Sequence, residues 1–100
     1  MERRILKEDE LSEAIQELDG WSIDTIMLKK RLEFENFAKA LAFVNKVGAL
    51  AESADHHPDI TFGWGYAEFY VTTHDRGGIT DVDIALASKI DQIQGQNRER

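Results

Sequence analysis

Three histidines are the side chains of this sequence best suited to chemistry. His56 and His57 are adjacent and precede the only proline, and His74 lies further along the chain. Histidine ordinarily titrates at about pH 6.5, so it can take or give a proton near neutrality. Glu52 and Asp55 stand just before the pair, where carboxylates can orient imidazole rings and favour their charged form. The pattern predicts a site for general acid–base catalysis.

Other kinds of site fit the sequence less well. The chain has no cysteine, which excludes thiol nucleophiles, disulfides and cysteine-ligated zinc. Three histidines could bind zinc, but adjacent histidines in an extended loop tend to point to opposite sides, and no HExxH spacing occurs. Neither Ser53 nor Ser88 lies in a nucleophile-elbow sequence. We therefore expect no metal, and an exposed histidine pair without a function stays open as the alternative.

Composition limits the class of protein. The chain has 100 residues, 42% hydrophobic, with a single proline, which is typical of one folded domain. Its 12 Lys+Arg against 19 Asp+Glu give a net charge of -7, which argues against direct nucleic-acid binding. No signal-peptide pattern and no membrane-length apolar run are present, so we expect a cytoplasmic protein that does not bind a membrane. Residues 96–100 read as a flexible tail.

Helical spacing of apolar residues predicts three helices. Gly20 stands after the first as a stop signal, and Asn36 is placed as the N-cap of the second. Thr80 and Asp83 have capping-box spacing ahead of the third, which we expect to end near Gly95. On the second helix, one apolar face is expected to carry Phe37, Leu41, Val44 and Ala51, and to be widened by Phe43, Val47 and Leu50. The three helices are expected over residues 8–18, 37–54 and 81–95.

Partly alternating aromatic and β-branched residues predict four strands. Two are expected within residues 21–34, joined near 24–26, and two more form a hairpin over 59–74 with Gly63 and Gly65 at its bend. The element order α-β-β-α-β-β-α predicts an α+β fold, with a four-stranded antiparallel sheet covered by helices on one face. Because the second hairpin strand returns to where the first began, His74 is expected near the histidine pair.

The spacing of the site residues closely resembles a family signature. Seven positions carry it: Glu52, His56, His57, Pro58, Trp64, His74 and Asp83. Together they resemble the pattern of the pterin-4a-carbinolamine dehydratases. The likeness extends to Gly20-Trp21, to the second helix and to the segment after His74, so that it covers about Leu11 to Ile93.

The resemblance implies an enzyme, a hydro-lyase that dehydrates 4a-hydroxytetrahydropterin to quinonoid dihydropterin in tetrahydrobiopterin recycling. It implies no metal and no other cofactor. By position, His56, His57 and His74 would be the acid–base set, with His56 and His74 the first choices for the essential proton transfers. The residues that would bind or surround the pterin are Glu52, Asp55, Thr72, Thr73, Asp75, Trp21, Trp64 and Asp83.

Simpler structural roles remain open for three of these residues. Asp83 could complete the Thr80 capping box, and Trp21 and Trp64 could be packed aromatics. The resemblance also implies a rival function, since some proteins of this fold act as binding partners, either as transcription coactivators or in the assembly of another enzyme. An open sheet edge favours a homodimer or homotetramer.

Overall fold

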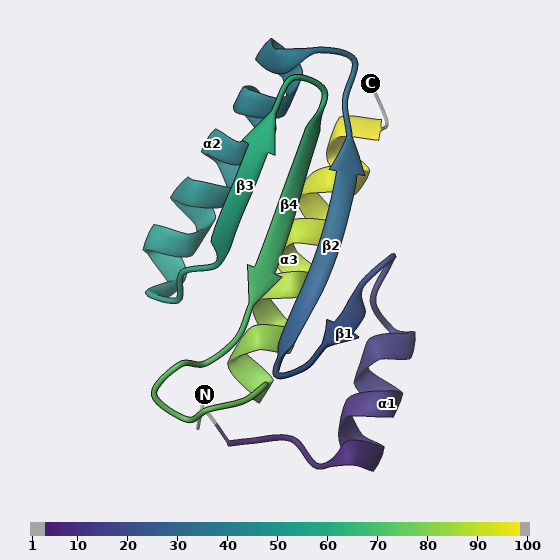
Figure 1. Cartoon of the computed structure of the whole chain (residues 1–100), viewed down its shortest axis with the longest axis vertical. Coiled ribbons are helices and arrows are strands. Elements are labelled where there is room, and N and C mark those ends of the chain that lie inside the picture. The colour runs from purple at the N-terminus through teal and green to yellow at the C-terminus, as the bar shows by residue number, and fades with distance from the viewer. Residues whose placement is uncertain (1–3, 99–100) are drawn as a thin grey trace.

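Three helices and one antiparallel sheet make up the computed structural model, which describes residues 4–98. The elements are α1 (Glu8–Gln16), β1 (Ser22–Asp24), β2 (Met27–Glu33), α2 (Phe37–Ala54), β3 (Asp59–Gly63), β4 (Tyr66–Val71) and α3 (Asp81–Arg98). The strands lie in the order β1-β2-β4-β3. Helices α2 and α3 cover one face of the sheet, and α1 lies beside β1 (Figure 1). The predicted α+β fold and element order are confirmed.

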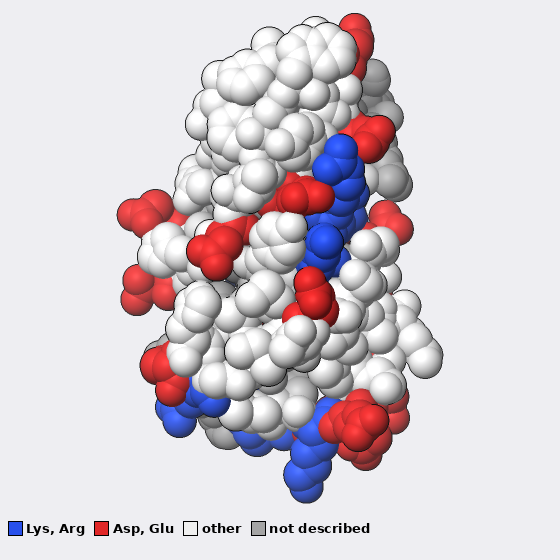
Figure 2. All heavy atoms as spheres, viewed as in Figure 1, with Lys and Arg blue, Asp and Glu red and all other residues white. Residues whose placement is uncertain are grey.

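The two faces of the sheet differ because side chains alternate along β2 and β4. Leu28 of β2 and Phe69 of β4 point into the core, where Phe43 of α2 meets Phe69 with ring centroids 5.8 Å apart. The opposite face carries charged and tyrosine side chains, and a stripe of Lys and Arg runs beside Asp and Glu across it (Figure 2). Arg31 of β2 pairs there with Glu68 of β4 at 3.0 Å. One face therefore holds the core and the other meets solvent.

Helix α2 begins where the sequence predicts, and it turns only part of the predicted apolar face to the sheet. The Asn36 side chain accepts a hydrogen bond from the Lys39 backbone N–H at 2.9 Å, as expected of an N-cap. The buried side chains of the helix are Ala40, Phe43, Val47 and Ala51. Phe37 and Leu41 were expected in the core, but they are 44% and 38% exposed. Apolar residues on α2 fit two overlapping faces, and the sheet covers the face centred on Phe43.

Helix α3 continues past its predicted end. It runs through Gly95 to Arg98, rather than stopping near Gly95. One glycine in a helix interior costs only about 1 kcal/mol relative to alanine, and no proline follows to force an end. Residues 96–98 of the expected tail therefore belong to the helix, and its last two positions, 99 and 100, lie outside the described residues.

A buried lysine joins β2 to α3. Lys30 lies on the covered face of the sheet and is 4% exposed. Its ammonium donates to Asp91 Oδ1 and to Gln94 Oε1, both at 2.7 Å, and also to the backbone carbonyl of Asp19. A buried charge is tolerated when it is paired and hydrogen-bonded in this way. The cluster fixes the segment before β1 against the second half of α3.

The described helices do not include one that is both long and apolar enough to cross a membrane.

Candidate active site

His56 enters the protein interior because of the way α2 ends. Asp55 caps the helix in the left-handed conformation, with φ of 53°. The Asp55 and His56 backbone N–H groups bond back to the carbonyls of Glu52 and Ala51, at 3.3 and 3.2 Å. Such a C-cap turns the chain sharply and satisfies the last carbonyls of the helix. The His56 side chain is thereby directed inward, and the residue is only 9% exposed.

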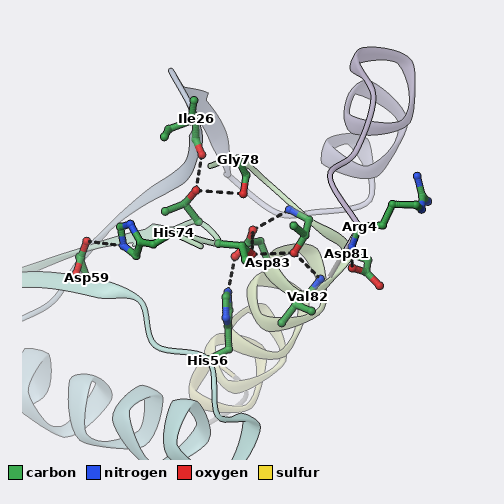
Figure 3. Close-up of polar contacts among 12 residues, drawn as sticks. Arg4, Ile26, His56, Asp59, His74, Gly78, Asp81, Val82 and Asp83 are labelled. Carbon is green, nitrogen blue, oxygen red and sulfur yellow. Dashed lines mark hydrogen bonds and ion pairs between the residues drawn. The ribbon is translucent and has the colours of Figure 1, made fainter. Parts of the chain in front are cut away.

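Asp83 receives His56 from the first turn of α3. One carboxylate oxygen, Oδ1, lies 2.5 Å from His56 Nε2 (Figure 3). The other, Oδ2, accepts hydrogen bonds from the Thr80 backbone N–H and the Thr73 hydroxyl, both at 2.8 Å. Asp83 is fully buried, so its contact with Nε2 is shielded from water. Asp83 thus makes its half of the predicted capping box, while the Thr80 hydroxyl accepts the Val82 backbone N–H at 3.3 Å, and the same carboxylate also holds a histidine.

The second ring nitrogen of His56 is accessible. Among residues 4–98 no hydrogen bond reaches Nδ1, and in the same part of the chain no buried side-chain nitrogen or oxygen lacks a partner. Nδ1 must therefore be open to solvent. His56 borders a pocket of about 570 Å³ between the end of α2 and the first half of α3. The pocket is lined by Ala54, Asp55, His56, Val82, Ala85, Leu86 and Lys89.

The other two histidines are exposed, and each lies beside its own carboxylate. His57 Nε2 is 2.5 Å from Glu52 Oε2, so the last turn of α2 orients this ring. His74 Nε2 is 3.9 Å from Asp59 Oδ2, a separation that suits an ion pair when His74 is protonated (Figure 3). Asp59 begins β3 just after the histidine pair, so this contact places His74 at the same end of the sheet. Within the described chain, no hydrogen bond or ion pair joins one histidine to another.

Two threonines of the loop between β4 and α3 differ in where their hydroxyls point. Thr73 is fully buried and contacts Asp83 directly. Thr72 is also buried, but its hydroxyl donates to the Ile26 carbonyl at 2.6 Å and so ties the loop to the turn between β1 and β2. Asp75 is exposed further along the loop. Of the three, only Thr73 belongs to the His56–Asp83 cluster.

The two tryptophans lie away from the histidines. Trp64 occupies the turn between β3 and β4, at the opposite end of the hairpin from Asp59, and is 73% exposed. Trp21 is buried, and its indole N–H donates to Asp91 Oδ1 at 2.8 Å. Neither residue lines the pocket beside His56. A role for them in substrate binding stays a prediction.

Sequence reasoning missed several residues of the site. Asp59 carries no signal of its own beyond following His-His-Pro, and Thr80 was interpreted only as a helix cap. The α3 side of the pocket, with Ala85 and Lys89, has no motif at all, because ordinary helical residues form it. Within residues 4–98, no group of three His, Asp or Glu side chains is arranged to hold a metal ion.

Relatives and solved structures resemble this chain over most of its length. A protein of Rubrobacter xylanophilus named "Putative pterin-4-alpha-carbinolamine dehydratase" is 47% identical over 89 residues, which cover 88% of this chain and 83% of the relative. One of Sulfurisphaera tokodaii with the same name is 41% identical, with 88% and 95% covered. A crystal structure of a "transcriptional coactivator/pterin dehydratase" from Brucella melitensis superposes with a TM-score of 0.85 at 32% identity, covering 90% of this chain and 98% of its own.

A further solved structure points to another role for the fold. It is described as a pterin dehydratase-like protein that is a RuBisCO assembly factor in the alpha-carboxysome, and it superposes with a TM-score of 0.63 at 29% identity, over 77% of this chain and 92% of its own. The family model for pterin 4 alpha carbinolamine dehydratase matches residues 4–93. The chain therefore belongs to the pterin 4 alpha carbinolamine dehydratase family.

Proposed function

We propose that this protein dehydrates 4a-hydroxytetrahydropterin to quinonoid dihydropterin and water, and so takes part in tetrahydrobiopterin recycling. The observation that carries the proposal is the His56–Asp83 pair, with Oδ1 and Nε2 2.5 Å apart and Nδ1 open to solvent beside a pocket. A histidine held by a buried carboxylate is a common arrangement for proton transfer. Membership of the family supports the class of substrate.

The reaction needs only an acid and a base. The acid protonates the hydroxyl on C4a, the C4a–O bond breaks, and water leaves. The lone pair of the adjacent ring nitrogen forms a double bond to C4a, and a ring N–H proton passes to the base. One proton is given and one is taken, and nothing is oxidised or reduced. Two histidines of suitable position can therefore complete the cycle without a cofactor.

We assign the two proton transfers to His56 and His74. His56 has a buried carboxylate partner that can balance the charge of its imidazolium, and the exposed carboxylate of Asp59, 3.9 Å away, can do the same for His74. His57, held by Glu52, supports the site or binds the polar pterin ring. The apolar side of the pocket, formed by α3, suits the flat face of a bicyclic ring. Asp55 at the pocket edge offers a carboxylate to the ring N–H groups.

The test follows the decay of enzymatically generated 4a-hydroxytetrahydropterin by ultraviolet absorbance. Wild type should accelerate the decay, while His56→Ala and His74→Ala should each lower kcat by about 100-fold or more. Thr61→Val changes an exposed strand residue on the open face and serves as the control for handling. Each variant is checked for folding by circular dichroism. A folded wild type that does not accelerate the decay would rule out the proposal.

Protein binding is a second candidate function, favoured by an exposed apolar patch formed by Phe37, Leu41 and Trp64. The end of the molecule that holds the start of α2 and the β3–β4 turn shows almost no charged side chains (Figure 2). Uncharged, partly aromatic patches of this kind mark interaction sites. We propose that the patch or the open edge of β3 joins copies of the chain into a dimer or tetramer. Light scattering of wild type should then report a multimer. The double variant Trp64→Ser with Phe37→Ser should dissociate it if the patch is the interface, and a proline in β3 should do so if the strand edge is. A monomeric wild type would exclude self-association.

A further inference from the structure

We infer that Thr73 and Thr80 form a one-way hydrogen-bond chain that positions Asp83 and leaves Nδ1 as the atom through which His56 exchanges protons. The catalytic part of this inference rests on the proposed dehydratase function. Neither threonine is itself part of the pocket lining, so both act as positioning residues. Thr73, Thr80 and Asp83 are all fully buried, which keeps water from competing for their hydrogen bonds.

The direction of the chain follows from counting donors. The Thr73 hydroxyl lies 2.8 Å from both Asp83 Oδ2 and the Thr80 hydroxyl. A carboxylate oxygen can only accept, so the single proton of Thr73 points to Asp83. The Thr80 hydroxyl must then donate to Thr73. The Thr80 proton is free to do so, because its hydroxyl oxygen acts only as an acceptor in its other contact, with the Val82 backbone N–H at 3.3 Å.

The two carboxylate oxygens of Asp83 are therefore not equivalent. Oδ2 is occupied by the Thr73 hydroxyl and the Thr80 backbone N–H, which leaves Oδ1 for His56. Because Oδ1 is an acceptor, His56 Nε2 must carry a proton. In the neutral ring Nδ1 then has the free lone pair, and it is the nitrogen that reaches solvent. A proton gained there produces an imidazolium whose charge faces a carboxylate that cannot rotate away.

An asparagine at position 83 tests this order directly. Since two donors point at the place of Oδ2, the amide oxygen of Asp83→Asn should take that place and the NH₂ group should face His56. Nε2 must then accept, and the ring proton moves to Nδ1. Long-range proton–nitrogen NMR spectra, recorded at a pH where the rings are neutral, should show the proton on Nε2 in wild type and on Nδ1 in the variant. Exposed His74 is an internal reference that should not change.

The same substitution should lower kcat by at least about 100-fold, because an Asp-to-Asn change beside a catalytic histidine holds the wrong tautomer. An Asp83→Asn protein that keeps the proton on Nε2 would overturn the inference. If that variant does not fold, wild type alone remains decisive, since a proton on Nδ1 of wild-type His56 contradicts the chain. The NMR result does not depend on activity. A protein without dehydratase activity would fail the proposed function and still test the hydrogen-bond order.

Thr73 itself is tested by a matched set of variants. Thr73→Val removes the hydroxyl at nearly constant volume and should lower kcat about tenfold with little change in KM, while Thr73→Ser should restore it. Thr72→Val removes a neighbouring buried hydroxyl that bonds to Ile26 instead of Asp83. The His56 Nε2 resonance should shift in Thr73→Val and stay in place in Thr72→Val. Equal shifts in both, or a Thr73→Val variant with wild-type kcat, would contradict the positioning role.

Discussion

The carboxylate of Asp83 lies 2.5 Å from His56 and at the same time accepts the Thr80 backbone N–H at 2.8 Å, so one side chain serves both the start of α3 and the candidate site. Stability and chemistry are coupled at this residue. A change at Asp83 alters the helix cap, whereas a change at His56 leaves the cap in place.

Asp83→Ala should therefore destabilise the protein more than His56→Ala. The cap is worth about 1 kcal/mol, and each buried donor left unsatisfied costs about 1–3 kcal/mol more. His56→Ala leaves one acceptor, Oδ1, without its partner while Oδ2 keeps its bonds to Thr73 and Thr80, whereas Asp83→Ala strands the donors of all three residues. Urea denaturation of both variants measures the two free energies of unfolding. Equal losses of unfolding free energy in the two variants would show that the bonds of Asp83 to Thr73 and Thr80 add nothing to stability beyond its contact with His56.

The contacts of Glu10 predict that the start of α1 loses stability in acid. Its carboxylate accepts hydrogen bonds from the Arg4 side chain and the Lys7 backbone N–H, both at 2.9 Å. These bonds, the Arg4 bond first, lower the pKa of Glu10 from 4.5 to about 2. A lowered folded-state pKa gives stability that is present above the ordinary pKa and is lost as the pH falls to about 2. Protection of the α1 amides against exchange, corrected for the intrinsic rate at each pH, should fall over that window.

Glu10→Gln is the control for this prediction, because an amide can accept the same bonds without titrating. The acid-dependent loss of protection should vanish in that variant. Because the group is exposed, added salt should weaken the effect in wild type. Protection factors in α1 that are independent of pH between 4.5 and 2 would contradict the assignment.

Tyr70, on the open face of the sheet, predicts a loss of stability at alkaline pH. Its hydroxyl donates to Glu68 Oε1 at 3.0 Å, and this bond to a carboxylate raises the pKa of Tyr70 above 10.0. The neutral phenol is the form favoured by folding, so its contribution is present below the ordinary pKa and is lost as the pH rises through the raised one. Ultraviolet titration in a Tyr66→Phe background follows Tyr70 alone. Adding Glu68→Gln should move the midpoint down towards 10, and an unchanged midpoint would refute the role of Glu68.

Much of the fold is predictable because its signals are local. Asn36 and Gly65 fix element ends through backbone geometry that depends on neighbours in sequence, and both act as predicted. The predicted end of α3 was wrong because a lone glycine weakens a helix without ending it. The partner of His74 was not foreseen, since Asp59 meets it only after the hairpin has formed. Pairings between distant residues follow from packing, and one sequence does not reveal them.

Lys30 is another residue whose distant partner the sequence does not reveal, and it gives a prediction about stability. Alternation places it on the same face as Leu28 and Leu32, but nothing near it in sequence identifies Asp91 as its partner. Lys30→Ala should cost about 3 kcal/mol or more, because it leaves Asp91 with a partly buried, uncompensated charge.

Lys29→Ala is the matched control. Lys29 precedes Lys30 and lies on the open face, 5.6 Å from the Tyr70 ring centroid, where the same substitution should cost less than about 1 kcal/mol. Thermal and urea unfolding of the two variants make the comparison, and fluorescence of Trp21, whose indole N–H bonds to Asp91, should report the loss in Lys30→Ala before global unfolding. Similar costs for the two lysines would mean that the buried ion pair adds no more to stability than an exposed lysine does.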